Sequence, residues 1–590
     1  MNETFTMNPA EKAAKEALDR VYACIEQRKS FVLEAGAGAG KTYSLIQALR
    51  YLVLNQGYAL QRKDQKIACI TYTNVARDEI ESRTDRNPVI FSATIHAFCW
   101  SLIKDFQPKL REILPQLDKW PDRLSDVGEL NNHYIKYDLG YPKVEDKQIL
   151  LGHDDVLSLT IRFIEDIKFR KILNHRFPII FIDEYQDTDI KFVDSIKKHF
   201  LDLNEGPLFG FFGDHWQKIY GSGCGIIEHS NVENIGKRAN FRSSKTIVEC
   251  LNRMRPDLTQ EVSDPSVEGS ILVYHTNDWQ GVRRSESHWK EDLPSDIAHM
   301  YLEETKRELT KSGWDFSPDK TKILMLTHNL LAQEQGYRNI ADVFSRNESY
   351  IKKEDDYIAF FVNTLEPVCV AYENRKFGQM FSALEGKTLV IRSHKDKNEW
   401  ATHMNTLLSL RKNGNIGMVI DHLRKTKFPP LPEKIGRIET GLESWSTMKE
   451  LDENEKKTFE RITKLKAIAY KEVIALANFI EERTPFATKH GVKGAEFDNV
   501  LVVIGRGWSM YNFSQMLEYA SIGVPSGKMD TYERNRNLFY VACSRPKKQL
   551  ALLFTQKLSI HAIETLSTWF GKESFRSLVL NHGDEISEQG

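Results

Sequence analysis

The stretch with the clearest chemistry is Ala-Gly-Ala-Gly-Ala-Gly-Lys-Thr at residues 35–42. Apolar residues at 31–33 precede it and a helical pattern follows it, which predicts a strand, a glycine-rich loop and a helix. The backbone N–H groups of such a loop face phosphate oxygens, and the helix N-terminus adds its dipole. Lys41 would reach the β- and γ-phosphates and the Thr42 hydroxyl would bind Mg²⁺. The predicted nucleotide-binding residues here are Ala35, Gly36, Ala37, Gly38, Ala39, Gly40, Lys41, Thr42 and Tyr43.

A second candidate feature is an apolar strand that ends in two carboxylates, Pro-Ile-Ile-Phe-Ile-Asp-Glu at 178–184. Asp183 would hold the water shell of Mg²⁺, and Glu184 would polarise the attacking water. Taken alone, the loop could be a small-residue turn and the acidic pair an exposed strand end. Their occurrence in this order favours a nucleotide site.

Residues 183–188, Asp-Glu-Tyr-Gln-Asp-Thr, resemble the DEXQD signature of the UvrD/Rep class of superfamily-one DNA helicases. The pattern G-x-x-x-x-G-K-[ST] has glycine where this chain has Ala35, and the family commonly reads AGAGSGKT there. Other segments resemble the remaining family motifs in the same order over most of the chain. The resemblance implies ATP and Mg²⁺ as cofactors and movement on single-stranded DNA from 3′ to 5′.

Four of these segments complete the nucleotide site by resemblance. Residues 213–221 (GDHWQKIYG) make Gln217 a γ-phosphate sensor, and residues 240–243 (NFRS) and 539–545 (FYVACSR) make Arg242 and Arg545 fingers that stabilise phosphate charge. Phe241 takes the place of an adenine-stacking tyrosine, and Glu496, in 488–497, would contact the ribose hydroxyls. The predicted catalytic residues are Lys41, Asp183, Glu184, Gln217, Arg242 and Arg545, with Thr42 and Asp183 as metal ligands.

The DNA-facing segments are also assigned by resemblance. Residues 70–76 resemble the family's TFTNKAA segment and 94–98 its TxHxx segment, with Tyr72 placed to stack on a base. The predicted DNA-binding residues are Tyr72, Thr73, Asn74, Thr94, His96, Tyr220 and His490.

The chain departs from the family pattern at two places. Ser222 stands where the family has a base-stacking tryptophan, a role that Trp216 could partly replace. Glu11 stands where the family has a glutamine that reads adenine, and a carboxylate cannot donate to the ring nitrogen. We therefore expect weaker gripping of the strand and looser base selectivity.

Short apolar runs between helical patterns predict the elements that position these residues. Candidate strands lie at 67–71, 178–182, 208–212, 271–274, 323–326, 500–504 and 550–554. The first three are expected to share one parallel sheet with the strand at 31–33, and the others to form a second sheet. The predicted fold class is α/β, with two RecA-like parallel-sheet P-loop NTPase domains, each with a mostly helical insertion.

The expected division of the chain follows this pattern. The first RecA-like domain comprises 1–103 and 155–235, with an insertion at 104–154. The second comprises 236–365 and 484–565, with an insertion at 366–483, and 566–590 is a C-terminal tail that we expect to be frayed.

Composition narrows the function classes. The 590 residues include 81 Lys and Arg and 82 Asp and Glu, so the net charge is close to zero. A DNA site must therefore be a local basic groove, because the chain as a whole has no excess of positive charge. The seven cysteines form no CxxC pair, which disfavours a zinc ribbon or iron–sulfur site and fits a reducing cytoplasm. No signal peptide or long apolar run is recognisable, so no membrane partner is expected.

We therefore expect an ATP-dependent DNA helicase or translocase that acts on single-stranded and tailed duplex DNA. Its role would lie in DNA repair and recombination or in anti-phage defence. The compact build resembles the helicase subunit of Gabija-type anti-phage systems, which implies a separate nuclease or ATPase subunit as partner. The alternative is a nucleotide-hydrolysing switch that binds DNA ends and regulates a separate nuclease, with little processive unwinding.

Overall fold

The computed structural model describes residues 7–580 except 126–129, 139–141, 219–220, 286–288, 327–331, 333, 345–347, 352, 385–392, 446–452, 482–483, 485, 489–495, 507–510 and 579. The chain divides into two compact units. The first unit comprises Met1–Val273, Met510–Leu550 and Ser559–Phe575, and the second comprises Tyr274–Ser509, Ala551–Leu558 and Arg576–Gly590. No helix in the described part of the chain is long and apolar enough to cross a membrane.

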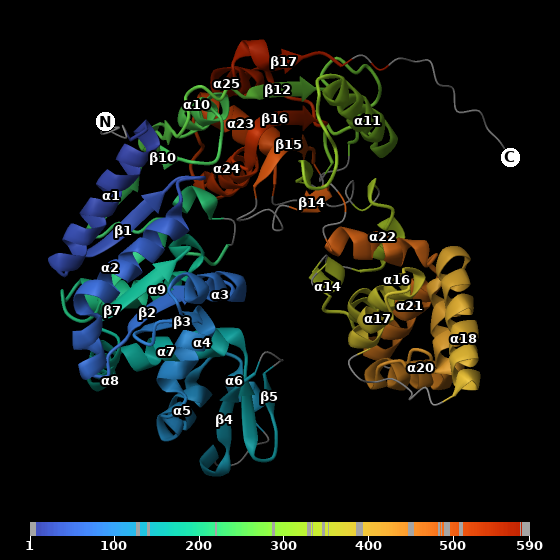
Figure 1. Ribbon diagram of the computed structural model, residues 1–590, viewed down its shortest axis with the longest axis horizontal. Helices are drawn as coiled ribbons and strands as arrows, with labels where there is room; N and C mark the ends of the chain where they lie inside the picture. Colours follow the sequence, from blue (N-terminus) through green and yellow to red (C-terminus); the bar gives the residue numbers. More distant parts are fainter. Residues whose placement is uncertain are drawn as a thin grey trace. The chain divides into compact units, whose positions relative to one another are not determined.

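The first unit is built on a six-stranded sheet in the order β3-β2-β7-β8-β1-β9, whose strands pair in parallel (Figure 1). The strands predicted at 31–33, 67–71, 178–182 and 208–212 all belong to this sheet, as expected. Its strands are β1 (Ser30–Ala35), β2 (Ile67–Thr71), β3 (Ile90–Thr94), β7 (Ile179–Asp183), β8 (Leu208–Gly213) and β9 (Val232–Lys237).

Both faces of this sheet are covered, which explains its apolar strands. On one face Phe31 and Phe181 pack with residues of α1 and α2, including Val21 and Leu45. On the other face the neighbouring Ile182 packs among residues of α4 and α7. The helices of this region are α1 (Pro9–Glu26), α2 (Lys41–Arg62), α3 (Asn74–Arg83), α4 (Ile95–Ile103), α7 (His153–Ile164), α8 (Ile167–Arg176) and α9 (Ile190–Ile196), with a π-helix at Lys197–Leu201.

The insertion at 104–154 is only partly helical, contrary to the prediction. It holds the short helices α5 (Gln107–Ile113) and α6 (Trp120–Arg123) and a three-stranded sheet in the order β4-β6-β5. The strands are β4 (Tyr134–Tyr137), β5 (Lys143–Val144) and β6 (Gln148–Leu151). Ile135 is buried between the exposed side chains of Tyr134 and Lys136, which is the period-2 alternation of a half-buried strand.

A second six-stranded sheet has the order β14-β13-β15-β16-β12-β17. The four later strand predictions, at 271–274, 323–326, 500–504 and 550–554, all fall within it. Its strands are β12 (Ser270–His275), β13 (Thr321–Met325), β14 (Phe486–Thr488), β15 (Phe497–Ile504), β16 (Pro546–Phe554) and β17 (Phe575–Arg576). Strand β13 pairs in parallel with both β14 and β15.

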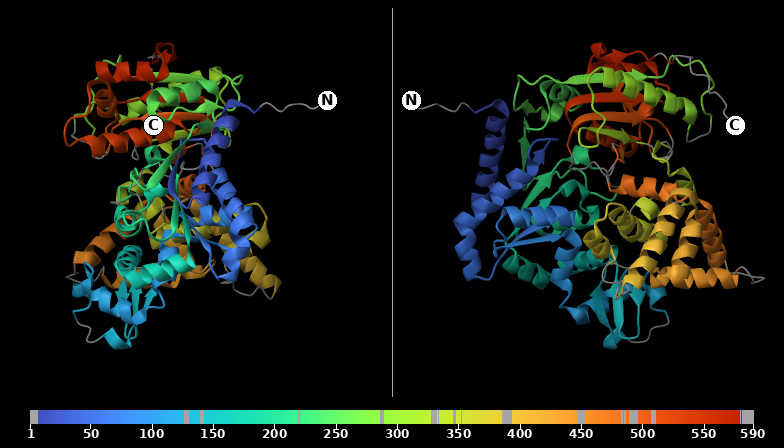
Figure 2. Two further views of the ribbon diagram at one scale, coloured as in Figure 1. Left: turned by 90° about the vertical axis from the view of Figure 1, so that its left-hand side faces the viewer. Right: turned by 45° about the vertical axis from the view of Figure 1, so that its right-hand side comes forward.

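The described part of the insertion at 366–483 is helical, as predicted, and its helices gather in a bundle, drawn in yellow and orange (Figure 2). Arg411 of α18 donates to Glu366 of α16 at 2.7 Å, and this buried ion pair joins two of the helices. The helices of the second unit are α11 (Ser295–Lys311), α13 (Arg338–Val343), α14 (Glu348–Ile351), α15 (Asp356–Phe360), α16 (Glu366–Glu373), α17 (Phe377–Ala383), α18 (His394–Asn413), α19 (Ile416–Thr426), α20 (Glu433–Trp445), α21 (Glu453–Ala467) and α22 (Lys471–Ile480).

The first unit has four further described helices. They are α10 (Lys245–Met254), α23 (Phe513–Ile522), α24 (Met529–Cys543) and α25 (Ile560–Phe570). The short strands β10 (Ala239–Asn240) and β11 (Glu261–Val262) pair in parallel. The tail was expected to begin at 566, but α25 continues to Phe570 and β17 follows it. The last ten residues, 581–590, lie outside the described residues.

Candidate nucleotide and nucleic-acid site

The glycine-rich loop connects the end of β1 at Ala35 to the start of α2 at Lys41, as predicted. Gly38 and Gly40 have φ values of +73° and +70°, a left-handed conformation that favours glycine. At Gly36 and Gly38 a side chain would also collide with neighbours, because a Cβ would lie 2.7 Å from Gln260 Nε2 and from Asn240 Oδ1 respectively. The glycine positions are therefore fixed by local geometry.

The segment after β9 holds this loop in place. The carbonyl of Ala37 accepts from Asn240 Nδ2 at 3.0 Å and from Gln260 Nε2 at 3.1 Å. The Phe241 N–H donates to the carbonyl of Gly38 at 2.9 Å, and Lys237 Nζ donates to that of Gly40 at 3.0 Å. Lys237 and Gln260 were not among the predicted residues. Each is a buried polar side chain, a type that needs a specific partner.

Lys41 lies against the predicted acidic pair. Its Nζ is 2.5 Å from Glu184 Oε1. Burial acts to lower the pKa of the Lys41 ammonium, but the charges of Glu184 and Asp183 outweigh it, and the pKa is raised. Glu184 follows β7 in a left-handed conformation, with φ of +51°. The loop lysine and the strand-end carboxylates therefore form one charged site.

Thr42 and Asp183 supply oxygen donors beside this lysine. Thr42 lies in the first turn of α2, and Asp183 is the last residue of β7, at the carboxyl edge of the parallel sheet. A hydroxyl and a carboxylate are hard oxygen ligands of the kind that Mg²⁺ takes together with water and phosphate oxygens. The donor set therefore fits Mg²⁺.

Gln217, Arg242 and Arg545 come together although they are far apart in the sequence. Arg545 Nη2 donates to Gln217 Oε1 at 3.3 Å, and Arg242 Nη1 donates to the carbonyl of Ser544 at 3.0 Å. Burial, together with the charge of Arg242, lowers the pKa of the Arg545 guanidinium. Two neighbouring cations of this kind are stabilised by an anion placed near both.

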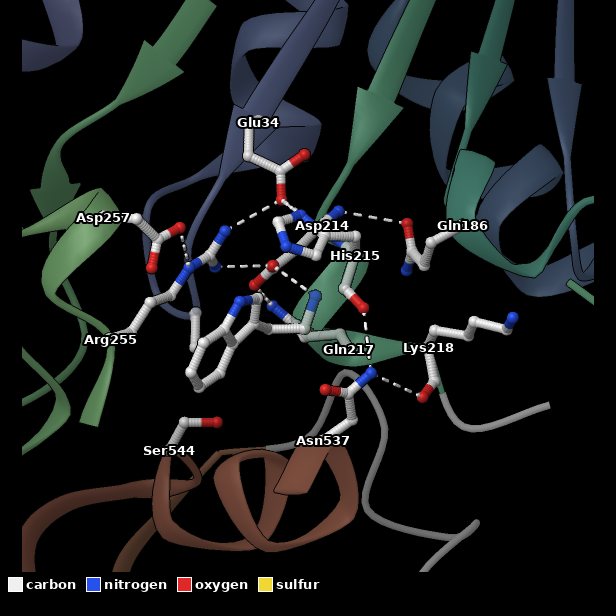
Figure 3. A network of polar contacts seen from close by, with 12 residues as sticks. Glu34, Gln186, Asp214, His215, Gln217, Lys218, Arg255, Asp257, Asn537 and Ser544 are labelled. Atoms are coloured by element: carbon white, nitrogen blue, oxygen red, sulfur yellow. Dashed lines mark hydrogen bonds and ion pairs between the residues drawn. The ribbon is translucent and has the colours of Figure 1, made fainter. Parts of the chain in front are cut away.

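A network of polar side chains that sequence reasoning missed adjoins Gln217 (Figure 3). Glu34 Oε1 accepts from His215 Nδ1 at 2.7 Å and from Arg255 Nη2 at 2.9 Å. Burial acts to raise the pKa of Glu34, but His215 and Arg255 lower it to about 2. Glu34 is a carboxylate within an otherwise apolar strand, and that pattern is the signal that a charged partner must lie nearby.

Two exposed aromatic rings stand beside the loop. Tyr43 and Phe241 are 58% and 43% exposed, and Lys237 Nζ lies 6.0 Å and 5.9 Å from their ring centroids. These rings are available to stack on a planar base. Glu11, expected at the base-reading position, instead caps α1: its carboxylate accepts from the Asn8 N–H at 3.0 Å, and Asn8 accepts from the Glu11 N–H.

The predicted DNA-binding residues that are described lie around two helix starts. Thr73 and Thr94 cap α3 and α4 through their hydroxyls, and Asn74 is the first residue of α3. Tyr72 and His96 share a pocket of about 240 Å³ with Asp183. Tyr220 and His490 lie outside the described residues, and Glu496 is exposed just before β15.

Trp216 does not have the role suggested for it. Its side chain is buried, its ring centroid is 5.3 Å from that of Tyr540, and the Arg536 guanidinium lies 3.9 Å from its centroid. A ring enclosed in this way offers no open face to a base, so the suggestion that Trp216 partly replaces the missing tryptophan is wrong.

Two protein-family models match the chain. The model described as an AAA domain matches residues 19–222, which contain the phosphate loop and β7. The model described as a UvrD-like helicase C-terminal domain matches residues 326–557, which contain Arg545. The resemblance to the UvrD/Rep class of helicases is therefore confirmed.

Individual proteins resemble it over nearly the whole chain. The chain is 26% identical to the Gabija protein GajB of Bacillus cereus (strain HuB5-5), over 92% of this chain and 95% of that protein. It is 22% identical to the ATP-dependent DNA helicase Rep of Buchnera aphidicola subsp. Schizaphis graminum (strain Sg), over 88% of this chain and 90% of that protein. The predicted Gabija-type resemblance is thus confirmed.

Proposed function

We propose that the protein is an ATP-dependent DNA helicase or translocase that moves from 3′ to 5′ on single-stranded DNA. The observation that carries this proposal is the contact between Arg545 and Gln217, 3.3 Å apart, in the same unit as the Lys41–Glu184 pair. Together these residues offer the cations and the polar amide that a phosphate chain requires. The similarity to the DNA helicase Rep, over 88% of this chain, supports DNA as the polymer along which the protein moves.

The residues suggest how hydrolysis would proceed. Lys41 is bound to Glu184 at 2.5 Å, and an arriving triphosphate competes for the same ammonium. Once Lys41 turns to the β- and γ-phosphates, Glu184 is released to orient the attacking water. Thr42 and Asp183 would hold Mg²⁺, and the bound ion would neutralise charge on the phosphates. Arg242 and Arg545 stabilise the charge that develops on the transferring phosphoryl group.

Departure of the γ-phosphate would remove an anion that both arginines bind, and so change the contacts of Gln217 and the two arginines. Tyr72 and His96, which share a pocket with the Asp183 carboxylate, would carry this change to bound DNA. Repeated cycles of this kind would move the protein along the strand.

We infer a role in anti-phage defence ahead of repair, in the cytoplasm, with a separate nuclease or ATPase subunit as partner. The similarity to GajB over 95% of that protein supports this choice. The seven cysteines of the chain are all free thiols, which fits a reducing compartment.

The test is ATP hydrolysis by the full chain with and without single-stranded DNA. Hydrolysis that DNA stimulates, and that Lys41→Ala abolishes, is expected. Lys15→Ala is a matched control, because Lys15 is an exposed lysine on α1. No hydrolysis on any length of single strand, or a Lys41→Ala variant as active as the wild type, would contradict the proposal.

One observation favours the second candidate function, a DNA-end-binding switch. Ser222 stands at the position of a stacking ring, and Trp216 is buried, so neither offers an aromatic surface to the strand. A switch would hydrolyse ATP on DNA ends while displacing little or no strand.

A further inference from the structure

Asp214 is the buried support of the Gln217 side chain. Its Oδ2 accepts from Gln217 Nε2 at 2.7 Å, and its Oδ1 accepts from the Trp216 N–H at 3.0 Å. The Asp214 side chain is 0% exposed. A buried carboxylate needs a nearby positive charge, because ionising it in such surroundings without one costs a large amount of free energy.

Arg255, directly after α10, provides that charge. Its guanidinium is 1% exposed and reaches Asp214 Oδ1 at 2.6 Å, Glu34 Oε1 at 2.9 Å and Asp257 Oδ2 at 3.4 Å. Burial acts to lower the pKa of Arg255, but the surrounding carboxylates raise it, so the group stays charged. Since Glu34 precedes the phosphate loop by one residue, Arg255 connects that loop to the turn that carries Gln217.

The same turn is held from the other side by α24. Arg536 lies over the Trp216 ring at 3.9 Å, and Arg255 lies on that ring at 5.3 Å. Asn537 Nδ2 donates to the carbonyls of His215 and Lys218 at 3.0 Å and 3.3 Å (Figure 3). Helix α24 ends at Cys543, two residues before Arg545.

Glu34, Asp214 and His215 could also be considered as metal ligands, because their ligand atoms lie within 4.8 Å of one another. Arg255 already binds both carboxylates of this group. The positive charge that the group needs is therefore supplied by the guanidinium.

We propose that Arg255 is a positioning residue for nucleotide hydrolysis, which fixes Asp214 and Trp216 so that Gln217 meets Arg545 and passes its displacement to α24. Arg255 acts through these residues and does not touch the nucleotide. The inference rests on the proposed function, because it concerns the same hydrolysis.

The first experiment compares Arg255→Gln, Arg255→Lys and the full-length wild type by steady-state ATP hydrolysis and by fluorescent-nucleotide binding. Since a misplacement of about 1 Å can cost about 100-fold, kcat is expected to fall about 10- to 100-fold. The Kd for nucleotide should change by less than about threefold. Lysine should restore little, because a single ammonium cannot bridge two carboxylates as a planar fork does. Arg20→Gln, which breaks an exposed ion pair with Glu233, is the control.

A second variant guards against a folding defect in Arg255→Gln. Arg536→Gln removes the second guanidinium that lies over the Trp216 ring. The Arg536 side chain is 14% exposed, and the change should lower kcat at least about fivefold with unchanged Kd. In a Gln217→Ala background, Arg255→Gln should cost less than about twofold more. A purely structural role predicts instead that the two losses multiply, and this would overturn the proposal.

The closing measurement separates this inference from the proposed function. Tryptophan fluorescence of the full chain is recorded with a non-hydrolysable ATP analogue, and Trp216→Phe identifies the signal of Trp216. The inference predicts a nucleotide-induced change that Arg255→Gln abolishes, even if the wild type proves unable to hydrolyse ATP. A change that persists in Arg255→Gln overturns the inference, whether or not hydrolysis is found.

Discussion

Arg545 Nη2 donates to Gln217 Oε1 at 3.3 Å, across a separation of 328 residues in the chain. Gln217 Nε2 also donates to Asp214 Oδ2 at 2.7 Å, and the backbone N–H of Asp214 donates to Gln186 Oε1 at 3.0 Å. Gln186 in turn donates to Glu184 at 2.5 Å. A continuous set of polar contacts therefore runs from the strand-end carboxylate to the buried arginine.

Lys41→Ala tests the phosphate loop. The substitution removes the cation bound to Glu184, so a triphosphate loses its main charged partner and hydrolysis should stop, a loss of at least about 100-fold. The fold should persist, because the loop is also held by Asn240 and Gln260. Circular dichroism and thermal unfolding check this, and a properly folded variant with wild-type turnover would remove the loop from the mechanism.

Arg545→Ala and Arg242→Ala test the fingers. Each should lower kcat by about 10³-fold or more, because finger arginines act on charge that develops in the transition state. Nucleotide affinity, measured with the fluorescent analogue, should change far less than kcat. Arg62→Ala, an exposed arginine at the end of α2, is the control. Equal losses in affinity and kcat would indicate ground-state binding instead.

Phe241→Ala and Glu11→Gln together test base recognition. Loss of a stacking ring worth about 1–3 kcal/mol should raise KM for ATP about 5- to 150-fold. Glu11→Gln should leave the preference among ATP, GTP and CTP unchanged, because the Glu11 carboxylate caps α1. Competition assays with the other nucleoside triphosphates measure this preference. A marked gain in ATP selectivity in Glu11→Gln would show that residue 11 reads the base.

His96 predicts a pH dependence of stability. Its ring lies 4.4 Å from that of His153, and burial, with the charge of His153, lowers the His96 pKa from 6.5 to about 4. Between these values the unfolded chain binds the proton and the folded chain does not, so stability falls as pH decreases through this window. The His96 contribution should fall by roughly 1 kcal/mol between pH 7 and pH 5, because the partly exposed ring is screened by solvent and feels only part of the full shift.

Urea unfolding of the wild type and His96→Gln at both pH values measures this contribution. The variant should lose less stability on acidification than the wild type does. His561→Gln, at an exposed position of α25, is the control. Identical pH dependence in His96→Gln and the wild type would contradict the prediction.

The sequence predicted the elements whose pattern is local. Strand β7 is apolar on both faces, and this pattern predicts a strand covered by helices. The glycines of the loop predict a turn with positive φ values, which Gly38 and Gly40 have. Strand β4 was missed because its alternation spans only four residues within a charged, helix-prone segment.

The supports of the site could not be predicted in the same way. Arg255 contacts Glu34 across 221 residues, and no local pattern identifies such a partner. The role of Trp216 was wrongly predicted because its neighbours, Arg255 and Arg536, come from other parts of the sequence. Candidate nucleotide-binding residues can be recognised from motifs, whereas the residues that hold them in place are recognised only from the fold.

Strand displacement on matched duplexes with a 3′ or a 5′ single-stranded tail tests the central claim most directly. The account predicts ATP-dependent displacement from the 3′-tailed duplex, little from the 5′-tailed one, and none with Lys41→Ala. Hydrolysis stimulated by DNA without displacement of either duplex would contradict it and favour the switch.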